Sequence, residues 1–199
     1  MRQVWKSTVM NIIYALIIYM VAGILTGVAA LFTAGSALLG SSSGATGFLA
    51  LTIVALLAMI GGFVWFFIGL SKFITLQRTE ADRSAVSMVR TSYIVLIAGA
   101  ILGLIPLIGW IITLLCGIAA YIMLIIAFGN FSKSEFMNEN GRAGASLLKV
   151  FGIIMLVCTV LAIIPFVNIL AILGEIAGII LLFLGWSRIS NGCPREDEF

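Results

Sequence analysis

The chain has 199 residues, of which 62% are hydrophobic and only 10% are charged, and its formal net charge is +3. Ordinary soluble domains contain about 25% charged residues, so a bilayer must be the solvent for this much apolar surface. The sequence has no histidine, which removes the usual ligand of zinc and haem, and its small net charge argues against nucleic-acid binding. We therefore expect an all-α integral membrane protein with no metal or other cofactor.

Six apolar runs are long enough to form spanning helices, each of which needs about 20 residues. They cover residues 8–32, 47–72, 88–105, 107–130, 147–164 and 167–187. The uncharged Gly/Ser stretch from Thr33 to Gly47 predicts a flexible loop between the first two helices. Pro106 and Pro165 predict tight turns after the third and fifth helices, because proline lacks an amide donor and disfavours a helical residue before it.

All eleven basic residues fall on one side of this arrangement, and the three opposite loops contain none. Basic residues near helix ends mark the cytoplasmic side, so both termini are predicted to be cytoplasmic. The chain would then be a single transmembrane domain of three N-in/C-in hairpins (8–72, 83–133 and 142–188) with a charged tail at 189–199, in a plasma (inner) membrane. Seven of the basic residues are expected to anchor the inner leaflet: Lys72, Arg83, Arg90, Lys133, Arg142, Lys149 and Arg188.

The last two hairpins have little length to spare. The segments from Arg90 to Lys133 and from Lys149 to Arg188 are just long enough for two helices and a turn. A re-entrant hairpin, with its turn covered by protein instead of lipid, is the alternative for each.

The second and third hairpins resemble each other as an internal repeat. A shift of 59 residues places Arg83, Ser87, Arg90 and Pro106 on Arg142, Ser146, Lys149 and Pro165. After a one-residue slip the match continues into the second helix of each hairpin. Because each unit holds two helices, the repeats would be parallel and related by an axis along the membrane normal. We expect the first hairpin to be a more diverged copy.

Glu175 is the one ionisable residue inside a predicted helix core. It lies about 12 Å from the nearer helix end at 1.5 Å per residue, too deep for a glutamate to reach the interface. With no intramembrane lysine or arginine to pair with, it should be protonated or cation-bound and should face protein or a water-filled cavity. Both a proton or cation site and a neutral carboxyl hydrogen-bonded to a neighbouring helix fit this pattern. Thr113, Thr159 and Tyr121 are candidate partners.

Six glycines form small-xxx-small pairs, which let helix backbones approach closely in lipid. The pairs are Gly23/Gly27, Gly99/Gly103 and Gly174/Gly178. Most are expected to pack within the chain, with a subunit interface as the alternative for one pair. Because Gly174 and Gly178 flank Glu175, this stretch of the sixth helix is expected to face another helix.

The sequence contains no pattern typical of catalysis. Cys116, Cys158 and Cys193 lack metal-ligand spacing, no disulfide is expected among them, and no nucleophile stands beside a base. An active site needs at least two convergent polar groups, so we do not expect an enzyme. The leading hypothesis is an accessory or assembly protein that packs against lipid, other membrane subunits or itself. The alternative is a small proton- or cation-linked transporter or channel that uses Glu175.

Overall fold

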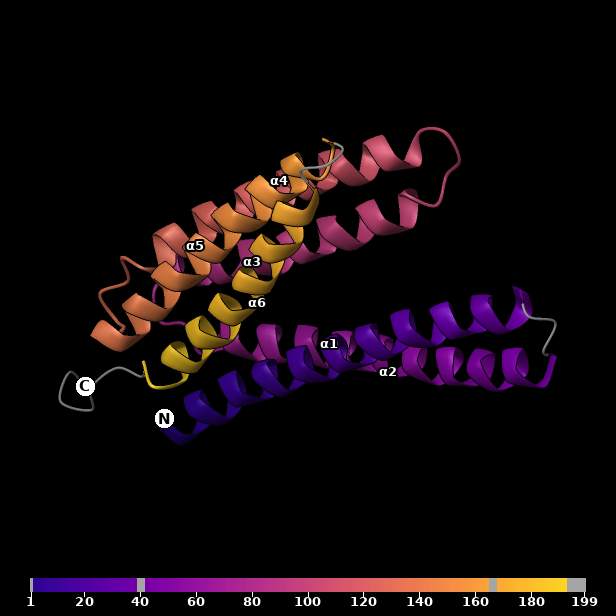
Figure 1. Ribbon diagram of the computed structural model, residues 1–199. Helices are drawn as coiled ribbons and strands as arrows, with labels where there is room; N and C mark the ends of the chain where they lie inside the picture. Colours follow the sequence, from indigo (N-terminus) through magenta and orange to yellow (C-terminus); the bar gives the residue numbers. More distant parts are fainter. Residues whose placement is uncertain (1, 39–41, 165–167, 193–199) are drawn as a thin grey trace. The chain divides into compact units, whose positions relative to one another are not determined.

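The computed structural model describes residues 2–38, 42–164 and 168–192. Within these ranges the regular structure is entirely helical (Figure 1). The helices are α1 (Arg2–Leu38), α2 (Ser42–Thr75), α3 (Glu80–Leu102), α4 (Gly109–Phe131), α5 (Glu139–Leu161) and α6 (Asn168–Ser190). All six are long and apolar enough to cross a membrane, so the chain is a multi-pass membrane protein, as its composition predicts.

The helices α3 and α5 begin about two turns before the predicted apolar runs. Hydropathy misses these polar first turns, which side chains cap instead. Thr79 accepts a hydrogen bond from the amide of Asp82 at 3.1 Å, and Asn138 accepts one from the amide of Gly141 at 3.0 Å. The polar residues that follow Thr79 and Asn138 therefore form the first turns of α3 and α5.

The prediction of a flexible loop from Thr33 to Gly47 is wrong. Both α1 and α2 extend into this stretch, and only residues 39–41 of it lie outside the described structure. The hydroxyls of Thr33 and Ser36 each donate a hydrogen bond to a carbonyl about one turn earlier, at 2.8 and 3.0 Å. A polar side chain satisfied within its own helix does not interrupt that helix, and the neighbouring alanine and leucine residues favour it.

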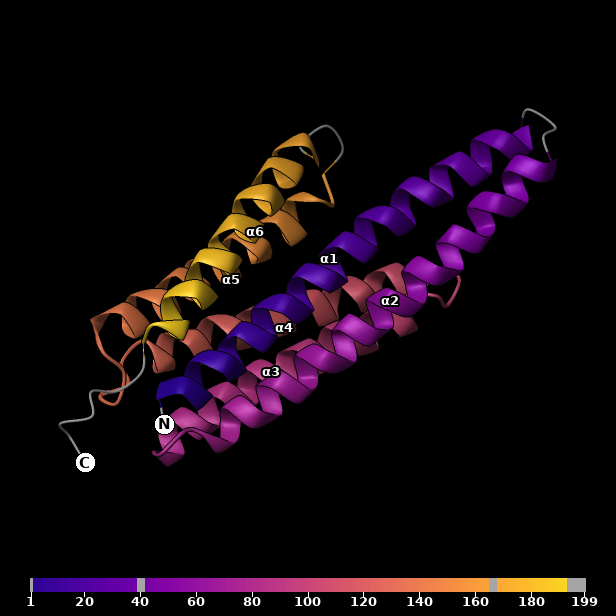
Figure 2. The same cartoon turned by 90° about the horizontal axis from the view of Figure 1, so that it is seen from below.

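Contacts within the chain define two compact units. One is Asn11–Gly69, which comprises most of α1 and α2 and contains no charged residue. Here α1 and α2 run antiparallel and side by side (Figures 1 and 2). A Cβ atom at Gly62 would lie 3.0 Å from the amide nitrogen of Tyr19, so the two backbones approach closely. The other unit is Met1–Met10 with Leu70–Phe199.

In the second unit α3 packs on α4, α4 on α5, and α5 on α6. The last four helices have 23 residues each, and α5 and α6 start 59 residues after α3 and α4 respectively. The buried residues of α3 are Asp82, Ala85, Val86, Val89, Ser92 and Gly99, and those 59 positions later in α5 are Gly141, Gly144, Ala145, Leu148, Phe151 and Cys158. All six of the latter are also buried, so α3 and α5 bury the same face.

The turn between α3 and α4 contains Pro106, at the predicted break. A Cβ atom at Gly109 would lie 3.0 Å from the Cα of Gly103, so the two ends of the turn meet backbone to backbone. Leu107 has a φ of 71° and is 91% exposed, so the turn places one non-glycine residue in the left-handed region. The other predicted turn, at Pro165, lies outside the described residues.

A cluster of buried aromatic side chains joins the start of α1 to the ends of α2, α4 and α6. Lys6, Lys72 and Arg188 lie in these parts of α1, α2 and α6, and Lys133 follows α4, so we call this end of the helices the basic end. The members of the cluster are Trp5, Phe73, Phe128, Phe131 and Trp186. Neighbouring rings meet edge-on with centroids 4.9 to 6.2 Å apart, an arrangement that aromatic pairs prefer. Trp5 Nε1 also donates a hydrogen bond to the carbonyl of Ile189 at 2.8 Å. The cluster therefore fastens the start of α1 and the end of α2 to the ends of α4 and α6.

Candidate functional site

Glu175 lies seven residues into α6, and its side chain is exposed. The expectation that it faces protein or a water-filled cavity stays a prediction. Gly174 and Gly178, which flank it, do face α5: a Cβ at Gly178 would lie 3.1 Å from the sulfur of Met155, and one at Gly174 would overlap the sulfur of Cys158. Glu175 thus projects beside the packed face of α6, since each residue turns about 100° around the helix axis.

The two threonines proposed as partners of Glu175 direct their hydroxyls elsewhere. Thr113 donates to the carbonyls of Gly99 and Gly109, both at 3.0 Å, and Thr159 donates to the carbonyl of Met155 at 2.8 Å. These bonds tie the hydroxyls to helix backbones instead of to the carboxyl.

The surface around Glu175 is apolar. Ile169, Ile172, Leu173 and Ile176 are between 51% and 69% exposed. A carboxyl on such a surface can accept or donate a hydrogen bond, or pair with a cation from outside. None of these four apolar neighbours brings a polar group to the carboxyl.

The glycine pairs differ in what they contact. Gly99 and Gly103 lie against α4, where a Cβ at Gly99 would be 2.5 Å from the Cβ of Cys116. In α1, a Cβ at Gly23 would lie 4.0 Å from the sulfur of Met59, and one at Gly27 would meet nothing within 4 Å. Together with Gly174 and Gly178, four of the six glycines therefore pack closely against a neighbouring helix, and Gly23 makes an ordinary van der Waals contact.

The four-residue pattern missed a contact at which the backbones of α5 and α6 meet. A Cβ at Gly144 would lie 2.6 Å from the carbonyl oxygen of Gly185, and one at Gly141 would lie 3.0 Å from the Cα of Gly192. The signal that points to it is a seven-residue spacing of small residues along α6 and just beyond, at Ala171, Gly178, Gly185 and Gly192, all buried.

The basic residues expected as anchors lie toward the basic end of their helices. Lys72 and Arg188 are in the last turns of α2 and α6, and Lys133 follows α4. Arg83 and Arg142 are in the first turns of α3 and α5. Arg90 and Lys149 lie about 15 Å along the same two helices, at 1.5 Å per residue. All are exposed except Arg90, which is half-buried. The stem of Lys149 lies against α4, with its Cδ 3.7 Å from a Cβ built at Gly129.

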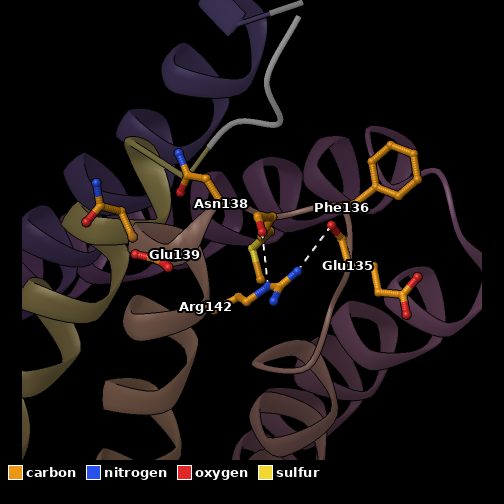
Figure 3. A pocket seen from close by; sticks show the side chains of 7 residues that line it. Glu135, Phe136, Asn138, Glu139 and Arg142 are labelled. Carbon is orange, nitrogen blue, oxygen red and sulfur yellow. Dashed lines mark hydrogen bonds between the residues drawn. The ribbon is translucent and has the colours of Figure 1, made fainter. Parts of the chain in front are cut away.

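The α4–α5 loop forms a polar hollow of ≈ 380 Å³ at the basic end (Figure 3). Its lining includes Glu135, Met137 and Arg142. Arg142 donates from its guanidinium to the carbonyls of Met137 and Glu135, at 3.1 and 3.3 Å, and Asn138 donates to the carbonyl of Asn191 at 3.0 Å. These polar groups hold the loop in place, so we interpret the hollow as part of the loop's architecture.

A buried polar contact also ties α3 to this loop. Ser134 donates its hydroxyl to Asp82 Oδ2 at 2.7 Å, and the two residues are 6% and 5% exposed. The two residues are 52 positions apart, so no local sequence pattern indicates this contact.

Replacing Asp82 with alanine is expected to lower the free energy of unfolding by about 1–3 kcal/mol, since the Ser134 hydroxyl loses its acceptor while remaining buried. Chemical unfolding in a mild detergent measures this. Asp82→Asn is the matched control, because its amide oxygen can still accept the bond, and it should lose less. Equal losses in the two variants would mean that the hydrogen bond is not the source of the effect.

Among the residues that the structure describes, no group of three or more histidine, cysteine, aspartate or glutamate side chains could hold a metal ion, and Cys116 and Cys158 are free thiols. Cys193 lies outside the described residues. No family model, curated protein or solved structure matches the chain.

Proposed function

We propose that this chain is a non-enzymatic component of a membrane complex, which binds partner subunits through its spanning helices. The main support is Glu175, an exposed acid on the apolar surface of α6. A charged side chain at the centre of a spanning helix costs about 2.5–3.5 kcal/mol, so an exposed acid within the bilayer favours a partner that covers it. The short connections between the helices also leave little protein outside the bilayer for other work.

The proposal places both termini in the cytoplasm and the chain in a plasma (inner) membrane, as three hairpins. Its support is the gathering of lysine and arginine at one end of the helices. The 35 Å that 23 residues span at about 1.5 Å per residue is enough to cross a hydrocarbon core of about 30 Å, which favours full spans over re-entrant hairpins.

We further propose that the α3–α4 and α5–α6 pairs are parallel repeats. Corresponding contacts support this. In α3–α4, Gly99 packs against Cys116, and in α5–α6 the residue types are exchanged, with Cys158 against Gly174. Each pair therefore has one glycine and one cysteine at the same place in the contact. Cys158 follows Gly99 by 59 residues and Gly174 follows Cys116 by 58, and the difference is the one-residue slip seen in the sequence.

The transporter or channel hypothesis requires a solvated cavity at Glu175. The apolar surroundings of this carboxyl, on the outside of the α5–α6 pair, favour partner binding over conduction.

Gentle extraction of the protein from its native membrane, followed by native mass spectrometry, tests the proposal. We expect a stoichiometric companion, either another subunit or further copies of the chain. Recovery of the chain alone, in a detergent that leaves other complexes of the same membrane intact, would contradict the proposal. A proton-linked flux that is abolished by Glu175→Gln would then favour the transporter.

A further inference from the structure

The surface of α4 that contacts α5 can be compared with the corresponding surface of α6. A Cβ at Gly117 of α4 would lie 3.4 Å from the methyl carbon of Thr159, and one at Gly152 of α5 would lie 3.1 Å from Ile125 and 3.6 Å from Leu124. Gly117, Leu124 and Ile125 thus belong to the stripe of α4 that contacts the next helix.

The corresponding stripe of α6, 58 residues later, contains Glu175, Leu182 and Phe183. At the basic end this stripe is covered: Leu182 is 7% exposed, and Trp186 packs against Phe73 with ring centroids 5.9 Å apart. Farther from the basic end it is open at Glu175, whereas its counterpart Gly117 is buried. We call the half of α6 that lies farther from the basic end its outer half. It presents the face that corresponds to the α5-binding face of α4, with Glu175 in place of Gly117.

Among the residues that the structure describes, no basic side chain is suited to that acid. Of the lysine and arginine residues in the described ranges, those nearest in depth are Arg90 and Lys149. They lie about 18 Å from the far ends of α3 and α5, whereas Glu175 lies about 10 Å from the far end of α6. Side chains lean toward the N-terminus of a helix, which for α3 and α5 is the basic end, so both lean away from Glu175. A second copy in the same orientation has the same mismatch.

We infer that the outer half of α6 is a docking site for a transmembrane helix of a different protein, which carries a lysine or arginine at the depth of Glu175. This inference rests on the proposed function and specifies its partner. Ionisable residues inside membranes pair with one another, because the low dielectric strengthens the attraction and both groups leave the hydrocarbon surface. The apolar residues beside Glu175 pack against the rest of the partner helix.

The test uses a designed single-span helix of leucine and alanine with one lysine about 10 Å from its outer end, and a second probe with leucine at that place. A basic cytoplasmic tail fixes the orientation of both probes. Each is co-expressed with the full chain, and association is measured by energy transfer between fluorescent tags in native membranes. We expect the lysine probe to bind the wild-type chain about 3- to 30-fold more tightly than the leucine probe, the range typical of polar contacts between helices in lipid.

The matched control is the double variant Glu175→Ala with Ala177→Glu. It keeps the composition and nearly the depth of the acid but moves it to the far side of α6, where Ala177 is exposed. Its lysine preference should fall to within about twofold of unity, while helix content and elution volume confirm that it still folds. Equal binding of both probes to the wild type would overturn the inference, and so would a lysine preference that survives in the double variant. Either result leaves the proposed function standing if native extraction still yields a companion.

Discussion

Replacing Trp186 with alanine is expected to lower the free energy of unfolding by about 3–5 kcal/mol, the loss typical of removing a large aromatic side chain from a packed core. Trp186 is 1% exposed and contacts both Phe73 and Phe128 edge-on. Its removal would leave a cavity where the ends of α2, α4 and α6 meet. Unfolding of the purified protein by a denaturing detergent, followed by circular dichroism, measures the loss.

Trp110→Ala is the matched control, because Trp110 is 64% exposed and lies at the start of α4, away from the basic end. It should change the free energy of unfolding by less than about 0.5 kcal/mol, as most surface substitutions do. If both tryptophan variants lost the same stability, the aromatic cluster would not be what holds the helix ends together.

The cluster also shows what sequence patterns do not reveal in a membrane protein. Trp186 directly precedes Ser187 and Arg188 near the end of α6. A tryptophan close to the end of a spanning helix commonly lies at the membrane interface. Hydropathy cannot distinguish that position from a buried one, since lipid-facing and protein-facing residues are equally apolar. Trp5 and Phe73 lie 68 residues apart, and only the three-dimensional packing brings them together.

Helix number and helix length differ in how well they can be predicted. The number follows from the apolar runs, because spanning segments must satisfy their backbone groups internally. The helix ends do not follow from the apolar runs. Caps such as Asn138 extend helices into polar sequence, and so do hydroxyls bonded within a helix, such as that of Thr33.

Glu175 illustrates the same limit at the candidate site. The sequence shows that it is the one acid within an apolar run, but not which way it points. A turn of about 100° per residue separates it from Gly174, which packs against α5, so one position decides between burial and exposure.

Replacing Gly185 with isoleucine is expected to lower the free energy of unfolding by about 3 kcal/mol or more, at the upper end of the usual range for overpacking. A Cβ there would lie 2.6 Å from the Cγ of Leu148 and 3.0 Å from the carbonyl oxygen of Gly144. The side chain of Leu148 can shift, but the backbone of Gly144 cannot move without separating α5 from α6. Detergent-induced unfolding gives the energy, and the distance between spin labels at the exposed residues Val150 and Ile180 gives the separation.

Gly27→Ile provides the control, since a Cβ at Gly27 meets nothing within 4 Å. Glycine is a poorer helix former than isoleucine, so this variant should be as stable as the wild type or slightly more stable. The contrast separates the cost of the contact from the effect of changing a glycine in an apolar helix. A Gly185→Ile variant that unfolded like Gly27→Ile, with the spin-label distance unchanged, would mean that α5 and α6 do not pack backbone to backbone. The contact between Gly174 and Cys158 depends on the same close approach, so it too would be lost if the helices separated, and with it the support for Glu175 lying on the outside of the pair.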